Sequence, residues 1–453
     1  MPSKNPIIIG GGISGLSAAY DLRRAGIPFT LIEKQPRLGG VIETRHEHGC
    51  TLECGPDSFL SSKPDAIALI QELGLDGDVI GSNDHQRTTY ILKRGRLVPL
   101  PEGMMMIVPS RAWPMVKSPL LGWGTKIRMG LEYFRRPSGR PNADRSVAEF
   151  VGDHFGRETL DYLAEPLLSG VYGGNPASLS VASVLPRFAE MEAKYGSLVR
   201  GVLASRSRAS ASTGSLFRTL KQGLGSFVNR LAEGINHIQG AVESIEHHDS
   251  GVRARVNGDW MEASDIIVAT PAWNAAPLLA PTDGALAELL FKIDYSSSLI
   301  LSLIYDAAKF DGYRAGFGFL VPAKERHRLA ACTFVGTKFS HRAPNDRIVL
   351  RCFFGGTSDP AVLSESDASI VNIARHELKQ MIGLTAEPLA FAVSRWPRTM
   401  AQYAVGHSTR ATEIRERAAA IPWLALAGNA YEGIGIPDCI RTGRAAARRV
   451  IER

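Results

Sequence analysis

Six residues near the N-terminus, Gly10–Gly15, read GGGISG and contain the pattern G-x-G-x-x-G. In this pattern the first glycine makes a tight turn, the second lets the backbone approach a pyrophosphate, and the third lets a helix pack closely on a strand. Glu33 follows at the spacing that places a carboxylate on a ribose hydroxyl, which disfavours the 2′-phosphate of NADP. The chemistry indicated is dinucleotide binding, by Gly10, Gly11, Gly12, Ile13, Ser14, Gly15 and Glu33.

The elements around this motif have the order that the chemistry needs. Ile7–Ile9 is a short, continuously apolar run that predicts a buried parallel strand. A helical pattern follows the glycines and ends at Gly26, and residues 29–32 form a second apolar strand just before Glu33. The start of that helix offers free N–H groups and a positive dipole end to phosphates.

Two later segments favour FAD over NAD. A second glycine pair, Gly39–Gly40, lies shortly after Glu33 and suits a cofactor that continues across the sheet edge. Near the C-terminus an apolar strand ends at Gly428, and the turn 433–438 leads into a helix that begins near Pro437. A helix start beside the isoalloxazine would stabilise the negative charge of reduced flavin.

Another apolar run, residues 265–272, predicts a strand between these two ends, and residues 238–245 and 252–256 are expected to form a hairpin before it. We interpret these strands as the middle segment of the FAD domain, where the chain re-enters that domain, with Val242 near the adenine.

Composition excludes several classes of protein. The chain has 453 residues, enough for two or three domains, and a net charge of +7 without a dense basic block, so no nucleic-acid partner is predicted. The 5 cysteines include no C-x-x-C pair, which disfavours a disulfide framework or a metal site and fits a reducing compartment. No signal peptide and no apolar run long enough to span a membrane are expected.

Six segments together resemble the protoporphyrinogen/coproporphyrinogen oxidase family over nearly the whole chain. The first two, GGGISGLSAAYDL and RLGGVIET, occur in many flavoproteins. The third is GCTLECGPDSFLSSKP (residues 49–64), and the much more specific ones are EPLLSGVYGGNPASLSVASVLP (165–186), RWPRTMAQYAVGH (395–407) and AGNAYEGIGIPDCIRTG (427–443).

The resemblance implies an α/β architecture of three parts. A Rossmann-like FAD domain, similar to those of amine oxidases and p-hydroxybenzoate hydroxylase, would comprise residues 1–86, 200–275 and 398–453. Residues 87–199 would form a helical, membrane-facing insertion, and residues 276–397 an α+β substrate domain. A serine-rich stretch, 205–215, is expected to be a loop returning to the FAD domain.

The activity implied is six-electron oxidation of a porphyrinogen to a porphyrin in heme biosynthesis, with molecular oxygen as acceptor and hydrogen peroxide as product. The implied partners are a porphyrinogen, oxygen and a ferrochelatase that receives the product, in the cytoplasm or on the inner face of the cell membrane. Beyond the first glycine motif and Glu33, the FAD contacts would fall on Lys34, Arg37, Gly40, Val41, Gly55, Pro56, Asp57, Ser58, Val242, Trp396, Gly428, Asn429, Ile434, Gly435 and Ile436. Asn429 departs from the small residue often found in related chains, and residues 57 and 58 vary, which puts those side-chain contacts in doubt.

The substrate side needs a wide apolar cavity and cations for propionates, and no nucleophile is required. Arg87 matches the position of a substrate-binding arginine in the protoporphyrinogen-specific branch, although by itself it reads as a surface arginine. Gly170 either lets the backbone approach the macrocycle or ends a helix. Phe334 and Phe353 either sandwich the rings or, as is commoner, belong to the core.

Residues 103–136 mix Met, Trp, Leu and Phe with Arg and Lys, interrupted by prolines. The segment either lies on an anionic membrane surface or forms the apolar lid of a buried cavity.

Three functions remain open at this point. Arg87 favours protoporphyrinogen IX as the substrate, with coproporphyrinogen III as the alternative. An amine oxidase or carotenoid desaturase would explain the shared front motifs but not residues 395–407. A non-redox prenyl-protein carrier, similar to GDP-dissociation inhibitors, is disfavoured by the complete glycine set and the turn 433–438.

Overall fold

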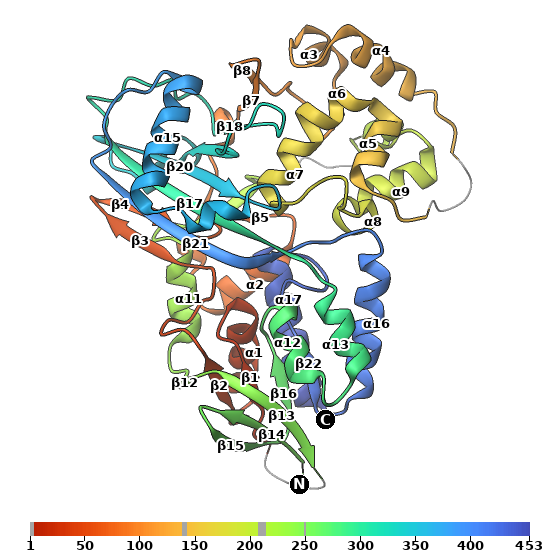
Figure 1. Ribbon diagram of the computed structural model, residues 1–453, viewed down its shortest axis with the longest axis vertical. Coiled ribbons are helices and arrows are strands. Elements are labelled where there is room, and N and C mark those ends of the chain that lie inside the picture. The colour runs from red at the N-terminus through yellow and green to blue at the C-terminus, as the bar shows by residue number, and fades with distance from the viewer. Residues whose placement is uncertain (1–3, 138–142, 207–213, 249–250) are drawn as a thin grey trace.

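The computed structural model describes residues 4–137, 143–206, 214–248 and 251–453. The predicted serine-rich loop lies largely outside these ranges, at 207–213. Figure 1 shows a lower α/β part that contains both chain ends, an upper sheet, and a group of helices beside it.

A parallel five-stranded sheet forms the centre of the lower part, as the apolar runs predicted. Its strand order is β12-β2-β1-β16-β22, and every neighbouring pair is parallel. Segments from the beginning, middle and end of the chain therefore lie side by side. The strands are β1 (Ile7–Ile9), β2 (Thr30–Glu33), β12 (His237–Gln239), β16 (Ile266–Val268) and β22 (Leu424–Leu426).

Both faces of this sheet are covered, which explains why β1 is apolar at every position. Ile8 packs in one core cluster, whereas Ile7 and Ile9 pack in the other. The helices on the Ile8 side are α1 (Ile13–Arg24), α2 (Pro64–Glu72), α11 (Leu224–Ala232) and α17 (Ile436–Glu452). The opposite side carries α12 (Ala272–Leu279), α13 (Gly284–Phe291), α16 (His407–Ala420) and the antiparallel strands β13 (Val242–His248), β14 (Gly251–Val256) and β15 (Asp259–Ala263).

The expected hairpin of residues 238–245 and 252–256 is only partly correct. β12 takes residues 237–239 into the parallel sheet, and β13 begins after Gly240 and pairs with β14. The predicted strand 265–272 is shorter than expected, because α12 begins at Ala272.

A seven-stranded sheet forms the upper part, in the order β21-β17-β20-β19-β18-β7-β8. Helix α15 (Asp367–Ile382) covers one of its faces (Figure 1) and seals a core of leucine, phenylalanine and cysteine side chains. The strands are β7 (Thr89–Lys93), β8 (Arg96–Pro99), β17 (Tyr295–Asp306), β18 (Gly318–Leu320), β19 (Ala331–Phe334), β20 (Arg347–Gly355) and β21 (Ala390–Ala401).

The first two strands of this sheet correct one expectation. Residues 87–199 were predicted to be a helical insertion, but β7 pairs in parallel with β18 and brings β8 with it. Their partner strand lies more than 200 residues later in the sequence, so no local pattern indicates the pairing. The helical segment begins only after these strands.

The helical part packs around a buried histidine. The His154 ring lies between Glu132 Oε1 at 2.7 Å from Nδ1 and Glu192 Oε1 at 3.0 Å from Nε2, and this joins α4, α5 and α9. The helices of this part are α3 (Ala112–Lys117), α4 (Trp123–Glu132), α5 (Val147–Phe155), α6 (Arg157–Thr159), α7 (Glu165–Tyr172), α8 (Val181–Val184), α9 (Pro186–Tyr195) and α10 (Leu198–Arg206). Of the helices in the described ranges, none has the length and apolar character that crossing a membrane requires.

Candidate functional site

The first glycine motif forms an uncapped helix start at the end of β1. Gly10 has φ 104°, and a Cβ atom on Gly15 would lie 1.9 Å from the Gly10 carbonyl oxygen, so only glycine fits at Gly15. Helix α1 begins at Ile13 without a side-chain cap and without an acid in its first turn. The N–H groups of this turn and the positive end of the helix dipole are therefore open to an anionic group.

Glu33 stands at the end of β2, directly beside this motif. Its Oε2 accepts a hydrogen bond from the Gly11 N–H at 2.7 Å, and its Oε1 accepts one from the Gln35 N–H at 2.8 Å. The Gly240 N–H donates to the Glu33 carbonyl at 2.9 Å, which brings the chain before Val242 to the same edge. Glu33 ends β2, whose parallel neighbour β12 leads through Gly240 to Val242 at the start of β13, so the two residues predicted for the adenosine side come to the same edge of the sheet.

The second glycine motif closes against the first. Gly39 pairs with Gly12, and its N–H donates to the Gly11 carbonyl at 2.8 Å. Arg37 Nη1 donates to the carbonyls of Leu38 and Ile42, at 2.9 and 2.7 Å, so this arginine braces the glycine loop through its side chain. Lys34 is exposed, and Gly40 (φ 59°) and Val41 follow at the surface.

The segment after β4 (Cys50–Glu53) packs on this loop. A Cβ atom on Gly55 would lie 1.7 Å from the Val41 carbonyl oxygen, so the two backbones are in direct contact there. The Trp396 indole N–H donates to the Cys54 carbonyl at 2.6 Å and fixes the same segment from β21. Trp396, predicted as a cofactor residue, therefore acts in this structure on the backbone of the loop.

Asp57 points away from the glycine motifs, into a buried group of charges. Lys338 Nζ lies 2.8 and 3.0 Å from its two carboxylate oxygens, and an Arg351 nitrogen lies 3.5 Å away. Burial by itself would raise the pKa of Asp57, but Lys338 and Arg351 outweigh it and lower that pKa. Ser58 donates to Asp57 Oδ1 at 2.6 Å, so both of these variable side chains belong to the same group of polar contacts.

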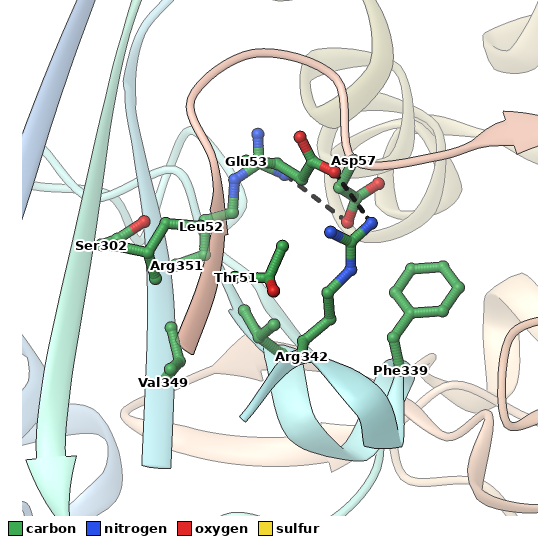
Figure 2. A pocket seen from close by; sticks show the side chains of 10 residues that line it. Thr51, Leu52, Glu53, Asp57, Ser302, Phe339, Arg342, Val349 and Arg351 are labelled. Atoms are coloured by element: carbon green, nitrogen blue, oxygen red, sulfur yellow. Dashed lines mark ion pairs between the residues drawn. The ribbon is translucent and has the colours of Figure 1, made fainter. Parts of the chain in front are cut away.

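Figure 2 shows Asp57 and Arg351 from close by, together with Glu53 and Arg342, and its dashed lines mark the ion pairs among them. Arg342 and Glu53 form an ion pair of 2.8 Å, and their side chains are 1% and 3% exposed. Burial raises the pKa of Glu53, and the positive charge of Arg342 opposes that rise. The space that these residues line holds about 10 Å³, the room of about one water molecule. It is a packed ionic core between two sheets, too small for any substrate.

The C-terminal turn meets the first glycine motif from the other side. Gly428 has φ 130°, and its N–H donates to Thr442 Oγ1 at 3.1 Å. A Cβ atom on Gly443 would lie 2.1 Å from the Ser14 carbonyl oxygen, so α17 crosses α1 at backbone contact. Asn429, Ile434 and Gly435 precede α17 and Ile436 begins it, so these predicted cofactor residues belong to the turn that leads into the helix packed on α1.

The start of α17 carries its own charge pair. The Gly435 N–H donates to Asp438 Oδ2 at 3.2 Å, and the same oxygen lies 2.5 Å from Lys63 Nζ. Tyr172 lies at the end of α7. Burial raises the pKa of its hydroxyl to about 12, and the negative charge of Asp438 adds to this rise.

The four residues predicted for the substrate side lie in different environments in the structure. Arg87 is exposed just before β7, and no hydrogen bond or ion pair of its side chain is found among the described residues. Phe353 lies on the same face of β20 as Arg351 and is contacted by that guanidinium at 4.7 Å, so it faces the loop of Asp57.

The structure contradicts the helix-ending interpretation of Gly170 and the catalytic interpretation of Phe334. Gly170 lies inside α7, and the residue that ends the helix is Gly173, with φ 56°. A Cβ atom on Gly170 would meet only Leu320 at 3.4 Å among the described residues, so no neighbouring protein backbone requires glycine there, and the approach to a macrocycle stays a prediction. Phe334 is 2% exposed in the core beneath α15, which corrects its assignment as a catalytic residue and supports the core interpretation.

Several side chains that shape the site were not identified from the sequence. Lys338, Arg351 and Tyr403 each contact a predicted cofactor segment, but each lies far away along the chain. Tyr403 lies in the family-specific segment 395–407, so the sequence did contain a signal for this residue. No local pattern in the sequence indicates Lys338 or Arg351.

Comparisons with known proteins agree over the full chain. The family described as flavin containing amine oxidoreductase matches residues 13–451. A coproporphyrinogen III oxidase of Bacillus subtilis is 33% identical, with 98% of this chain and 97% of that protein covered. The chloroplastic protoporphyrinogen oxidase 1 of Arabidopsis thaliana is 28% identical, with 96% and 85% covered. A crystal structure of a provisionally named protoporphyrinogen oxidase from Exiguobacterium superposes with a TM-score of 0.88 at 30% identity, with 100% and 99% covered.

Proposed function

The chain belongs to the flavin-containing amine oxidoreductase family, and from that premise we propose that it uses FAD and oxygen to oxidise coproporphyrinogen III to coproporphyrin III. A porphyrinogen is the substrate class in the names of the full-length relatives, and this supports a role in heme biosynthesis. The relative that is 33% identical is named for coproporphyrinogen III, and the one named for protoporphyrinogen is 28% identical. The comparisons thus favour the alternative substrate over protoporphyrinogen IX, which Arg87 alone had favoured.

The single observation that carries the proposal is the meeting of the two chain ends around one anion-binding helix start. The backbone contact of Gly443 with Ser14, which packs α17 on the start of α1, supports a shared site, and the hydrogen bond between Gly11 and Glu33 supports an adenosine side at the end of β2. Two glycine motifs, an acid and a second helix start fit FAD better than NAD. The open first turn of α1 would bind the pyrophosphate, and Gly433–Ile436 would contact the isoalloxazine.

When bound, FAD supplies the hydride acceptor, and oxygen accepts the electrons with release of hydrogen peroxide. The chain's own residues bind and orient. The ion pair of Lys63 and Asp438 lies at the start of α17. Phe353 contributes an aromatic ring from β20. Arg87 lies exposed and unengaged among the described residues, as a propionate anchor requires.

The test is aerobic turnover of each porphyrinogen by the purified protein, followed by porphyrin fluorescence. We expect a yellow protein with bound FAD and a higher kcat/KM for coproporphyrinogen III. A preference for protoporphyrinogen IX, or equal rates, would remove the substrate assignment. A protein that binds FAD but oxidises only amines would replace the porphyrinogen proposal as a whole.

Arg87→Ala tests the anchor. If Arg87 binds a propionate, KM rises while kcat is retained. Arg96→Ala, a loss of another exposed arginine on the neighbouring β8, is the matched control and should leave both parameters unchanged. An unchanged KM for Arg87→Ala would exclude this residue from the site.

We also propose that α3 and α4 contact an anionic membrane surface. Trp113, Trp123, Ile127 and Phe134 are 60–74% exposed, whereas the lid interpretation requires such side chains to be covered. Lys117 and Lys126 lie 4.9 and 4.6 Å from the rings of the two tryptophans. In a sedimentation assay the protein should pellet with phosphatidylglycerol vesicles, and Trp123→Ala should weaken this binding; no binding to such vesicles would refute the membrane contact.

Delivery of the product to a ferrochelatase stays a prediction.

A further inference from the structure

One short segment, residues 399–405, lies between the flavin-side turn and the substrate-side helix. It includes the last residues of β21, which pair with the beginning of β17, and it ends shortly before α16. The segment was selected from the sequence as a specific motif, but binding of FAD or substrate does not explain it. Its contacts go in two directions.

Toward the flavin side, the Tyr403 hydroxyl makes two hydrogen bonds. It donates to the Asn429 carbonyl at 2.8 Å and accepts from the Gly433 N–H at 2.8 Å. The Asn429 side chain adds a third bond by donating to the Thr399 carbonyl at 2.9 Å. One hydroxyl therefore spans the turn 429–433, whose end leads into the start of α17.

The ring of Tyr403 is held as firmly as its hydroxyl. It is 3% exposed and stacks on His407 with a centroid distance of 3.8 Å and an interplanar angle of 11°. Removal of the hydroxyl would leave a buried carbonyl and a buried N–H without their partner, because the ring blocks access of water.

Toward the substrate side, the Gln402 side chain makes the corresponding contacts. Its Nε2 donates to the Tyr172 carbonyl at 2.8 Å and to Ser296 Oγ at 3.0 Å. The backbone continues the junction, because the Ser180 N–H donates to the Tyr403 carbonyl at 2.8 Å. Two adjacent residues thus hold the end of α7 and the turn before α17.

We infer that Tyr403 and Gln402 are positioning residues: Tyr403 fixes the turn that faces the flavin, Gln402 fixes the end of α7, and together they set the separation of cofactor and substrate. This inference rests on the proposed function for the identity of the two ligands. The two side chains act through different segments, so their loss should have different consequences.

Tyr403→Phe keeps the stacked ring and removes only the hydroxyl. We expect FAD to bind about tenfold more weakly, the visible flavin bands to shift, and kcat to fall with little change in KM. Gln402→Met keeps the volume and removes the donor, and we expect KM to rise about tenfold with a normal flavin spectrum.

Hydrogen exchange gives a readout that needs neither ligand. In the apoprotein, Tyr403→Phe should accelerate exchange in residues 428–435 and not in 172–180, and Gln402→Met should do the reverse. Tyr305→Phe is the control, since the Tyr305 hydroxyl is also buried but has no hydrogen-bond partner in the described part of the chain. It lies beneath α15, remote from both segments, and should change neither the exchange nor the kinetics.

The outcomes separate this inference from the proposed function. A wild-type protein that binds FAD and oxidises no porphyrinogen would end the proposed substrate, while the exchange and spectral comparisons would still test the positioning roles. If Tyr403→Phe lowers the melting temperature but keeps wild-type FAD affinity, spectrum and kcat, its role is structural and the inference is overturned. The same holds if both variants change the same segment equally.

Discussion

Acidification should destabilise the fold through His407. This side chain is 1% exposed beneath the ring of Tyr403, and its Nδ1 has no hydrogen-bond partner in the described residues. Burial lowers its pKa from 6.5 to about 4, with Arg410 adding to the fall and the Tyr431 carbonyl and Asp144 opposing it. The folded protein therefore keeps His407 neutral where the unfolded chain would protonate it.

The sign and size follow from that difference. A depressed histidine pKa gives stability that is present above pH 6.5 and is lost as the pH falls toward 4. Between pH 7 and pH 5 the unfolded state gains protons at this site while the folded state does not, and the free energy of unfolding should fall by about 2 kcal/mol. Below the folded pKa both states are protonated and the loss ends.

The assay is urea unfolding at pH 7, 6 and 5, followed by tryptophan fluorescence, for wild type and His407→Gln. Other groups also titrate in this range, so the measured quantity is the difference between the two slopes of stability against pH. The variant is expected to start less stable and to lose about 2 kcal/mol less on acidification. Parallel slopes would show that His407 is protonated in the fold, and would refute the reasoning from burial.

Three further substitutions test the site. Gly15→Ala should cost more than about 3 kcal/mol and abolish flavin binding because its Cβ atom would meet a carbonyl, whereas Gly152→Ala in α5, with open space around it, should change stability by at most about 1 kcal/mol; FAD content and urea melts check both. Arg342→Met should cost about 3–5 kcal/mol in urea unfolding because it leaves Glu53 buried without its partner, and the double variant with Glu53→Gln should cost less than the sum of the two. Trp396→Phe should lower the free energy of unfolding by about 1 kcal/mol and speed FAD release, and an unchanged release rate would exclude its hydrogen bond from holding the loop.

The backbone of the first glycine motif was predictable because its determinants are local. The turn at Gly10, the helix start at Ile13 and the acid at Glu33 fall within one short stretch, and the pattern of residue types fixes the backbone there. The apolar runs also predicted β1, β16 and β22, since strands buried on both faces need no polar alternation. The resemblance over the whole chain led to the family that the comparisons show.

The substrate side was not predictable in the same way. Phe334 and Phe353 occupy similar apolar strands, and only the pairing of β19 with β20 decides that one lies beneath α15 and the other faces Asp57. Strand side chains alternate between faces, so sequence alone does not tell which face is buried by a helix. β7 and β8 were assigned to a helical insertion because the partner strand β18 lies more than 200 residues later in the chain.

The sequence alone determined that this chain carries two glycine motifs and a C-terminal helix start suited to FAD, because each is a contiguous pattern with its own backbone geometry. Tertiary structure alone decided which groups act on them: Lys338 on Asp57, and Tyr403 on the turn before α17. Lys338 and Asp57 lie 281 residues apart in the sequence, and such contacts depend on how sheets and helices pack. Local residue types do not encode that packing in any pattern readable along the chain.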